Sequence, residues 1–208
     1  MVKIAVITES STKNRNAEII EALKGFGHEL HNLGMKNEEG EPDLTYMETG
    51  FLSALLLNLE AVDFVVGGCG TGQGYMNIVL QFPKTSCGII FDPVDAFLFS
   101  RVNAGNCVSL PLNKGYGNLA GNVNLRYIFE KLFDSSPGEG YPDARKDIQK
   151  VARKKLAKLS LQTHHTMDNI IDLIDKDIIK NTLSFPGVLD FISTAPESPL
   201  KTIVLGEV

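Results

Sequence analysis

A glycine-rich segment with a single cysteine is the strongest chemical signal in this sequence. Residues 65–76 read VVGGCGTGQGYM, so Cys69 lies among glycines directly after an apolar run. A glycine loop between a strand and a helix turns backbone N–H groups toward a ligand, and the helix N-terminus adds partial positive charge. Both effects favour an anion and the thiolate form of a cysteine. The segment therefore predicts a site for anionic chemistry.

Three common motifs do not fit this segment. A Walker A loop needs a lysine and a hydroxyl residue after its last glycine, and no lysine follows here. A dinucleotide fingerprint has the spacing G-x-G-x-x-G after the first strand, whereas this loop follows the third predicted strand and reads G-x-G-x-G-x-G. A cysteine phosphatase loop ends in an arginine, and Tyr75 stands at that place.

Proton abstraction next to a carbonyl group is the chemistry that remains. The Cys69 thiolate would take a proton from carbon, and the amides of the glycine loop would stabilise the enediolate oxygen. A second interpretation is structural, because a small buried cysteine beside glycines also permits close packing. The residues alone leave both interpretations open.

Composition narrows the class of protein. The chain has 208 residues, 43% of them hydrophobic, which suits one sizeable domain or one domain with a helical extension. A net charge of −5 argues against a nucleic-acid partner. The three cysteines fit neither a disulfide framework nor a metal motif. Because we find neither a signal peptide nor a membrane span, we expect a soluble cytoplasmic protein with no membrane partner.

Strands and helices are expected to alternate through residue 134, which predicts an α/β fold with an open parallel sheet and helices on both faces. The expected strands are 3–8, 28–33, 63–67, 85–91 and 106–111, and the expected helices are 16–26, 44–60, 72–82, 93–102 and 118–133. Ligands of such sheets bind beyond the carboxyl ends of the strands. Residues 8–10, 68–74, 92 and 111–114 should therefore meet at one edge.

The remainder of the chain, residues 135–208, is expected to be a linker followed by a helical extension. Residues 135–143 are rich in glycine and proline and predict a loop. A basic helix over 145–158 and an apolar helix over 167–183 follow, and the tail from Ser184, with three prolines, is expected to be irregular.

Three segments carry a resemblance to a known family. The cysteine loop, DPVDAFLFSRVNAGN (92–106) and DLTYMETG (43–50) are similar to segments of the ribose-5-phosphate isomerase B and galactose-6-phosphate isomerase family. The resemblance covers about residues 1–150. It implies a Rossmann-like three-layer αβα sandwich with a five-stranded parallel sheet, and an isomerase domain over 1–134. It also implies aldose–ketose isomerisation without a cofactor or metal, and a homodimer or tetramer with active sites between subunits.

The resemblance also assigns roles to individual residues. Cys69 would be the base that moves a proton between C1 and C2, and Asn103 matches an asparagine of the family's following turn. Thr71 and Glu9 are the candidates for a second acid or base, and Glu9 stands where the family usually has aspartate. The expected substrate-binding residues are Ser10, Tyr46, Gly70, Gly72, Gly74, Asn103 and Lys114.

Several departures from the family pattern bear on the substrate. The family's ring-opening histidine aligns with Val102, and a second histidine of the family aligns with Ser10. The arginine that the family uses to bind phosphate has no clean match, and Lys114 is the cation nearest to its place in the sequence. These changes favour a substrate that is already open-chain. NLRYIFEKLF (124–133) resembles a longer branch that acts on a 4-deoxy-5-hexosulose uronate. The small anionic substrate is therefore either this uronate or a sugar phosphate similar to ribose 5-phosphate. The alternative function is a binding module that kept the loop without catalysis.

Overall fold

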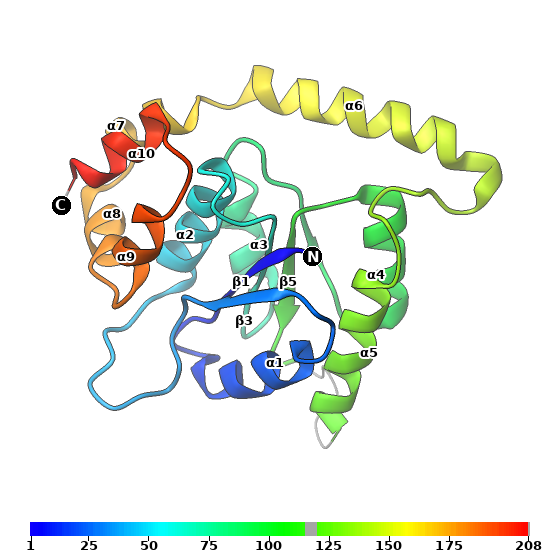
Figure 1. Ribbon diagram of the computed structural model, residues 1–208, viewed down its shortest axis with the longest axis horizontal. Coiled ribbons are helices and arrows are strands. Elements are labelled where there is room, and N and C mark those ends of the chain that lie inside the picture. Colours follow the sequence, from blue (N-terminus) through cyan, green and yellow to red (C-terminus); the bar gives the residue numbers. More distant parts are fainter. Residues whose placement is uncertain (115–119, 208) are drawn as a thin grey trace.

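A five-stranded parallel sheet forms the centre of the protein. The computed structural model describes residues 1–114 and 120–207 (Figure 1). The strand order is β2-β1-β3-β5-β4, which confirms the predicted sheet. The chain runs outward from β1 to β2 and then returns to form β3 on the other side of β1, so the carboxyl ends of β1 and β3 flank the switch point of the sheet. The strands are β1 (Lys3–Ile7), β2 (Glu29–Asn32), β3 (Phe64–Cys69), β4 (Cys87–Ile89) and β5 (Cys107–Pro111).

Helices cover both faces of the sheet and make the expected three layers. Alternate residues of a strand point to opposite faces. Accordingly, Ile4 and Val6 pack into one core with α1, α4 and α5, while Ala5 and Ile7 pack into another with α2 and α3. The helices are α1 (Asn16–Leu23), α2 (Tyr46–Asn58), α3 (Gln73–Val79), α4 (Pro93–Leu98) and α5 (Gly121–Phe133).

Two predicted helix boundaries change in the structure. The helix expected over 93–102 begins at Pro93, where the Asp92 carboxylate accepts hydrogen bonds from Val94 N (2.8 Å) and Asp95 N (3.0 Å). Its last turn widens into a π-helical segment, Phe99–Asn103. The helix expected over 118–133 is seen from Gly121 onward, and residues 118 and 119 lie outside the described residues.

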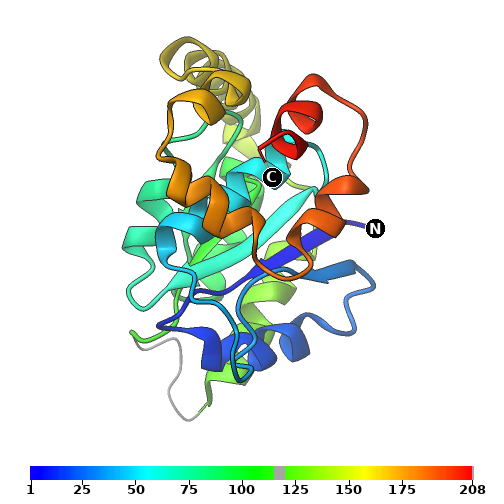
Figure 2. The same ribbon diagram turned by 90° about the vertical axis from the view of Figure 1, so that its left-hand side faces the viewer.

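Helix α2 is buried on nearly all sides, from Glu48 through Leu57. Its N-terminus carries a capping box, in which Thr45 and Glu48 exchange hydrogen bonds. One side of α2 packs on the sheet, and α8 packs on the other (Figure 1). The C-terminal helices share this core, which explains why α2 is apolar around its whole circumference. They are α7 (Met167–Leu173), α8 (Lys176–Leu183), α9 (Val188–Ser193) and α10 (Pro199–Leu205). Figure 2 shows this end of the molecule facing the viewer.

The single helix predicted over 167–183 is wrong, because the structure has two helices there. Ile174 has extended backbone (ψ 155°), which ends α7. The Asp175 carboxylate then accepts a hydrogen bond from Asp177 N at 2.9 Å and begins α8. The apolar periodicity of residues 167–183 predicts one helix, and the capping aspartate within it divides that helix into two.

The irregular tail predicted from Ser184 is also wrong, because α9 and α10 form there. Proline is favoured in the first turn of a helix, where its missing N–H has no partner to lose. Pro199 occupies that place in α10, and the Ser198 hydroxyl accepts a hydrogen bond from Lys201 N at 3.2 Å. Pro199 therefore begins a helix instead of preventing one.

Helix α6 (Lys146–Thr163) runs along the outside of the body and has no buried residue (Figure 1). It extends five residues beyond the predicted end at 158. The Arg153 guanidinium donates to Val102 O (2.7 Å) and Gly138 O (2.8 Å). Directly after the C-terminal end of α6, His164 Nε2 lies 3.3 Å from Leu80 O. Helix α6 therefore links the α4 end of the molecule to the α3 end.

None of the helices in residues 1–114 and 120–207 is long and apolar enough to cross a membrane.

Gly67→Ala is expected to destabilise the protein by about 1–3 kcal/mol through overpacking. A Cβ at Gly67 would lie 2.2 Å from the hydroxyl oxygen of Tyr75. Tyr75 is fully buried, and its hydroxyl lies 2.6 Å from Ser53 Oγ, so the ring has no room to move. Urea unfolding followed by circular dichroism measures the loss. Gly206→Ala, at the end of α10, is the control and should change stability by less than about 0.5 kcal/mol. Equal stability of the two variants would contradict this account of the packing.

Candidate active site

The cysteine loop joins β3 to α3 by a tight turn. Cys69 is the last residue of β3 and is 7% exposed. Its carbonyl oxygen accepts hydrogen bonds from Gly72 N (3.2 Å) and Leu112 N (3.1 Å), which tie the loop to the chain after β5. Gly72 has φ +74°, a conformation that glycine adopts without steric strain. The backbone thus holds the thiol at the carboxyl end of the central strand.

Thr71 lies beside the thiol. Its hydroxyl oxygen is 3.9 Å from Cys69 Sγ. The same oxygen accepts a hydrogen bond from Gln73 N at 3.3 Å, at the start of α3. This bond orients the Thr71 side chain toward the cysteine.

Glu9 is a buried carboxylate in the loop after β1. It is 4% exposed, and its oxygens accept hydrogen bonds from Ser11 N (2.9 Å), Thr12 Oγ1 (3.3 Å) and Ser10 Oγ (3.4 Å). The Ser11 hydroxyl donates to Glu9 Oε1 as well. A carboxylate taken out of water is stable only when such donors surround it. Ser11 is not among the predicted site residues, although it directly follows Glu9 and Ser10, which are.

Asn113 connects the two loops. Its backbone N–H donates to Gly70 O at 2.9 Å, and its side-chain Nδ2 donates to Ser11 O at 3.0 Å. Asn113 falls within 111–114, which were predicted to lie at this edge, but it is not among the predicted site residues. A polar residue two positions beyond a central strand was the available signal.

Tyr46 joins the same edge from the start of α2. A Cβ at Gly74 would lie 3.4 Å from the Tyr46 ring, so the ring packs against the glycine loop. Ser10 N donates to Leu44 O at 2.8 Å and ties the β1 loop to the same segment. Eight predicted site residues therefore lie in loops and helix starts at one edge of the sheet: Glu9, Ser10, Tyr46, Cys69, Gly70, Thr71, Gly72 and Gly74.

Of the two remaining predicted site residues, Lys114 lies at this edge but points toward Phe91, and Asn103 lies at the opposite edge. Lys114 is exposed at the same edge, but its Nζ is 5.9 Å from the centroid of the Phe91 ring, beyond β4. Asn103 precedes β5, whose first residue, Cys107, pairs with Val65 near the start of β3. Within one chain Asn103 and Cys69 therefore lie at opposite edges of the sheet.

Cys107 belongs to the core, as the sequence predicts, whereas Cys87 is partly buried, packs against that core and lines a cavity. They are paired on β4 and β5, and Cys107 is fully buried. A hydrogen bond with Cys107, together with burial, raises the pKa of the Cys87 thiol well above its ordinary value. Cys87 therefore stays protonated at neutral pH.

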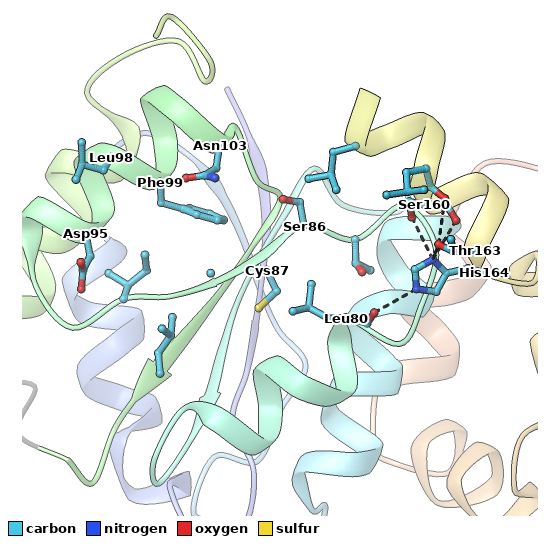
Figure 3. Close-up of a pocket in the computed structure, with 16 residues that line it drawn as sticks. Leu80, Ser86, Cys87, Asp95, Leu98, Phe99, Asn103, Ser160, Thr163 and His164 are labelled. Carbon is cyan, nitrogen blue, oxygen red and sulfur yellow. Dashed lines mark hydrogen bonds between the residues drawn. The ribbon is translucent and has the colours of Figure 1, made fainter. Parts of the chain in front are cut away.

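A cavity of about 530 Å³ lies at the edge that holds Asn103 (Figure 3). Strand β4, the end of α3, helix α4 and helix α6 surround it, and its lining includes Leu98, Phe99, Leu156 and His164. Cys69 does not line it. Within residues 1–114 and 120–207, no three His, Cys, Asp or Glu side chains gather closely enough to hold a metal ion.

Comparison with known proteins identifies the family. The family model for ribose/galactose isomerases matches residues 4–137, which is more than half of the chain. The chain belongs to the ribose/galactose isomerase family. This finding confirms the resemblance drawn from the cysteine loop, and it makes the chain a member of a family of sugar isomerases. A comparison with curated proteins gives no match.

Two solved structures of sugar isomerases match almost the whole chain. One is a 4-deoxy-L-threo-5-hexosulose-uronate ketol-isomerase in complex with a tartrate. It is 39% identical, has a TM-score of 0.93, and covers 98% of this chain and 97% of that one. The other is a ribose-5-phosphate isomerase from Vibrio parahaemolyticus, 35% identical, with a TM-score of 0.94 and coverage of 100% and 99%. The type B ribose 5-phosphate isomerase of Trypanosoma cruzi is 18% identical over 77% of this chain and 99% of its own, with a TM-score of 0.64, and shares the fold.

Proposed function

We propose that the protein is an aldose–ketose isomerase in which Cys69 moves a proton between two adjacent carbons. The observation that carries this proposal is the placement of Cys69 at the end of the central strand, with Thr71 Oγ1 at 3.9 Å and the Glu9 loop tied to it through Asn113. The family membership supports the same reaction. No cofactor is needed for a proton transfer of this kind.

Each part of the site has a role in the proposed reaction. The Cys69 thiolate removes the proton from carbon and returns it to the neighbouring carbon. Gly72 N and Gln73 N hold the turn itself, so other amides of the loop Gly70–Gly74 would face the enediolate oxygens, where fixed dipoles stabilise developing charge. Thr71 holds a hydroxyl at the thiol, and Tyr46 closes the glycine side of the site. Ser10 forms part of the wall after β1.

An open-chain uronate is the substrate that the residues favour. Val102 stands where related enzymes have a ring-opening histidine, and its side chain transfers no proton. A carboxylate needs less positive charge for its binding than a phosphate dianion does, and Lys114 is a cation at this edge of the sheet. The 39% identical structure is a ketol-isomerase of 4-deoxy-L-threo-5-hexosulose uronate. Ribose 5-phosphate is the second candidate, because the 35% identical ribose-5-phosphate isomerase covers the whole chain.

A second copy of the chain is part of the proposal. Asn103 is exposed at the edge opposite Cys69, so it reaches a cysteine loop only in a partner subunit. Apolar side chains, including Leu98 (39% exposed) and Leu156 (60%), surround the cavity at Asn103. Such a surface suits burial against another protein. We therefore propose a homodimer, alone or as half of a tetramer, with active sites between subunits.

The substrate proposal predicts a clear order of turnover. With 4-deoxy-L-threo-5-hexosulose uronate, ribose 5-phosphate, allose 6-phosphate and galactose 6-phosphate as substrates, the uronate should give the highest kcat/KM, by about tenfold or more. A tenfold difference in kcat/KM corresponds to about 1.4 kcal/mol of difference in the activation free energy. Product formation is measured by nuclear magnetic resonance. A higher kcat/KM for ribose 5-phosphate would reverse the substrate assignment. Binding of a compound without turnover of any would contradict the isomerase and favour a binding module.

A further inference from the structure

The loop after β1 meets the cysteine loop at Gly70. A Cβ at Gly70 would lie 3.5 Å from Ser11 Oγ and 3.2 Å from Asn113 Nδ2, so the open side of this glycine faces both side chains. The Ser11 hydroxyl donates to Glu9 Oε1, and Ser11 N donates to Glu9 Oε2 at 2.9 Å. An exposed hydroxyl beside the cysteine loop is thereby connected to a buried carboxylate.

We propose that Ser11 and Glu9 form a proton relay that serves the oxygen atoms of the substrate, while Cys69 serves its carbon atoms. The proposal rests on the isomerase function above and adds Ser11 to its catalytic groups. Ser11 is exposed and Glu9 is 4% exposed, so the substrate would meet the hydroxyl and the carboxylate would lie behind it. This arrangement suits a relay better than direct contact with Glu9.

Isomerisation needs two separate proton movements. One proton leaves the carbon that bears the hydroxyl group and arrives on the former carbonyl carbon, which is the work of Cys69. A second proton leaves the substrate hydroxyl and arrives on the former carbonyl oxygen. In the relay, Ser11 Oγ accepts this proton and passes its own to the Glu9 carboxylate. Return along the same path protonates the carbonyl oxygen, so that Ser11 and Glu9 end each turnover as they began.

Asn113 is the positioning residue of the relay. It donates to Ser11 O at 3.0 Å from its side chain and to Gly70 O at 2.9 Å from its backbone, so it fixes the distance between the two loops. Removing its side chain breaks the bond to Ser11 O and leaves the backbone bond to Gly70 in place. The relay would then lose its alignment with the thiol without losing either chemical group.

The test compares two rates in the same samples in D2O. The first is exchange of the carbon-bound substrate proton with solvent, and the second is isomer formation. We use the substrate that the wild-type protein turns over fastest. Ser11→Ala should lower isomer formation by about 10²-fold, in the range of general acid–base contributions. Exchange should fall much less, because Cys69 still forms the enediolate and can return a proton to the carbon it came from. The ratio of exchange to isomerisation should therefore rise at least tenfold.

Three further variants complete the test. Ser11→Thr keeps the hydroxyl and should restore isomer formation to within about tenfold of the wild type. Asn113→Ala should raise the exchange ratio as Ser11→Ala does, but less. Asn14→Ala, an exposed residue of the same loop, is the control and should leave both rates unchanged.

The outcomes separate this inference from the function on which it rests. A higher ratio in Ser11→Ala, with rescue by Ser11→Thr, supports the relay. Equal loss of both rates in Ser11→Ala, or no change in either, overturns the relay while the isomerase function stands. Absence of both exchange and isomerisation in the wild-type protein overturns the proposed function and the relay with it.

Discussion

Replacing Cys69 by alanine is expected to lower isomerisation by a factor of about 10²–10⁴ or more, because the variant has no base at the carbon atom. The loop itself should keep its shape. Its turn is made by backbone bonds from Gly72 N and Leu112 N to the carbonyl of residue 69, which alanine also provides. Initial rates with the best substrate, together with thermal unfolding, measure both parts of the expectation.

Two other cysteine variants make this test specific. Cys69→Ser should be nearly as inactive as Cys69→Ala, because a hydroxyl ionises far less readily than a thiol. Cys87→Ala removes a protonated thiol at the amino end of β4, away from the cysteine loop. This variant should turn over substrate at close to the wild-type rate. An active Cys69→Ala variant, or an inactive but folded Cys87→Ala variant, would contradict the assignment of the base.

Ile192→Asp is expected to destabilise the whole protein by roughly 4–5 kcal/mol, a large part of the stability of a typical domain. Ile192 in α9 is fully buried. It belongs to the same continuous core as Phe51 of α2 and Val65 of β3. An unpaired carboxylate in this core loses its hydration and gains no partner. Because the core extends across both parts of the chain, we expect one unfolding transition for all of it.

Leu205→Asp is the matched control in the same extension. Leu205 is 39% exposed, so the new carboxylate remains hydrated and the expected change is below about 0.5 kcal/mol. Unfolding is followed by circular dichroism and by calorimetry. Separate transitions for residues 1–134 and 135–208 in Ile192→Asp would contradict the shared core and favour two independent units. The division at residue 134 stays a prediction until this measurement.

The sequence carries enough information to predict the fold because its strands are short apolar runs with turn residues between them. All five strands form where those runs predict. The errors lie in the extension, where local capping overrides periodicity: Asp175 divides an apolar run, and Ser198 with Pro199 begins a helix in a tail that composition marks as irregular. Periodicity reports which face is buried, but it does not report where a side chain replaces a backbone hydrogen bond.

The candidate site was predictable where its residues follow strands directly. Cys69, Thr71 and Glu9 stand at strand ends, and the topology alone brings such ends together. Asn113 and Ser11 were not predicted as site residues, because what joins them is one hydrogen bond between loops about a hundred positions apart in the sequence. Asn103 showed the opposite difficulty: the sequence grouped it with the site, and only the strand register places it at the far edge.

Solvent deuterium incorporation tests the central claim most directly. The wild-type protein is incubated in D2O with the substrate that it isomerises best, and the product is examined by nuclear magnetic resonance at the carbon that receives the proton. Proton transfer by Cys69 through an enediolate predicts deuterium at this carbon, and the Cys69→Ala variant should form no deuterated product. A product that forms in D2O with only protium at this carbon, at a rate that is the same in the wild type and in Cys69→Ala, would indicate a transfer that does not use the thiol and would contradict the account.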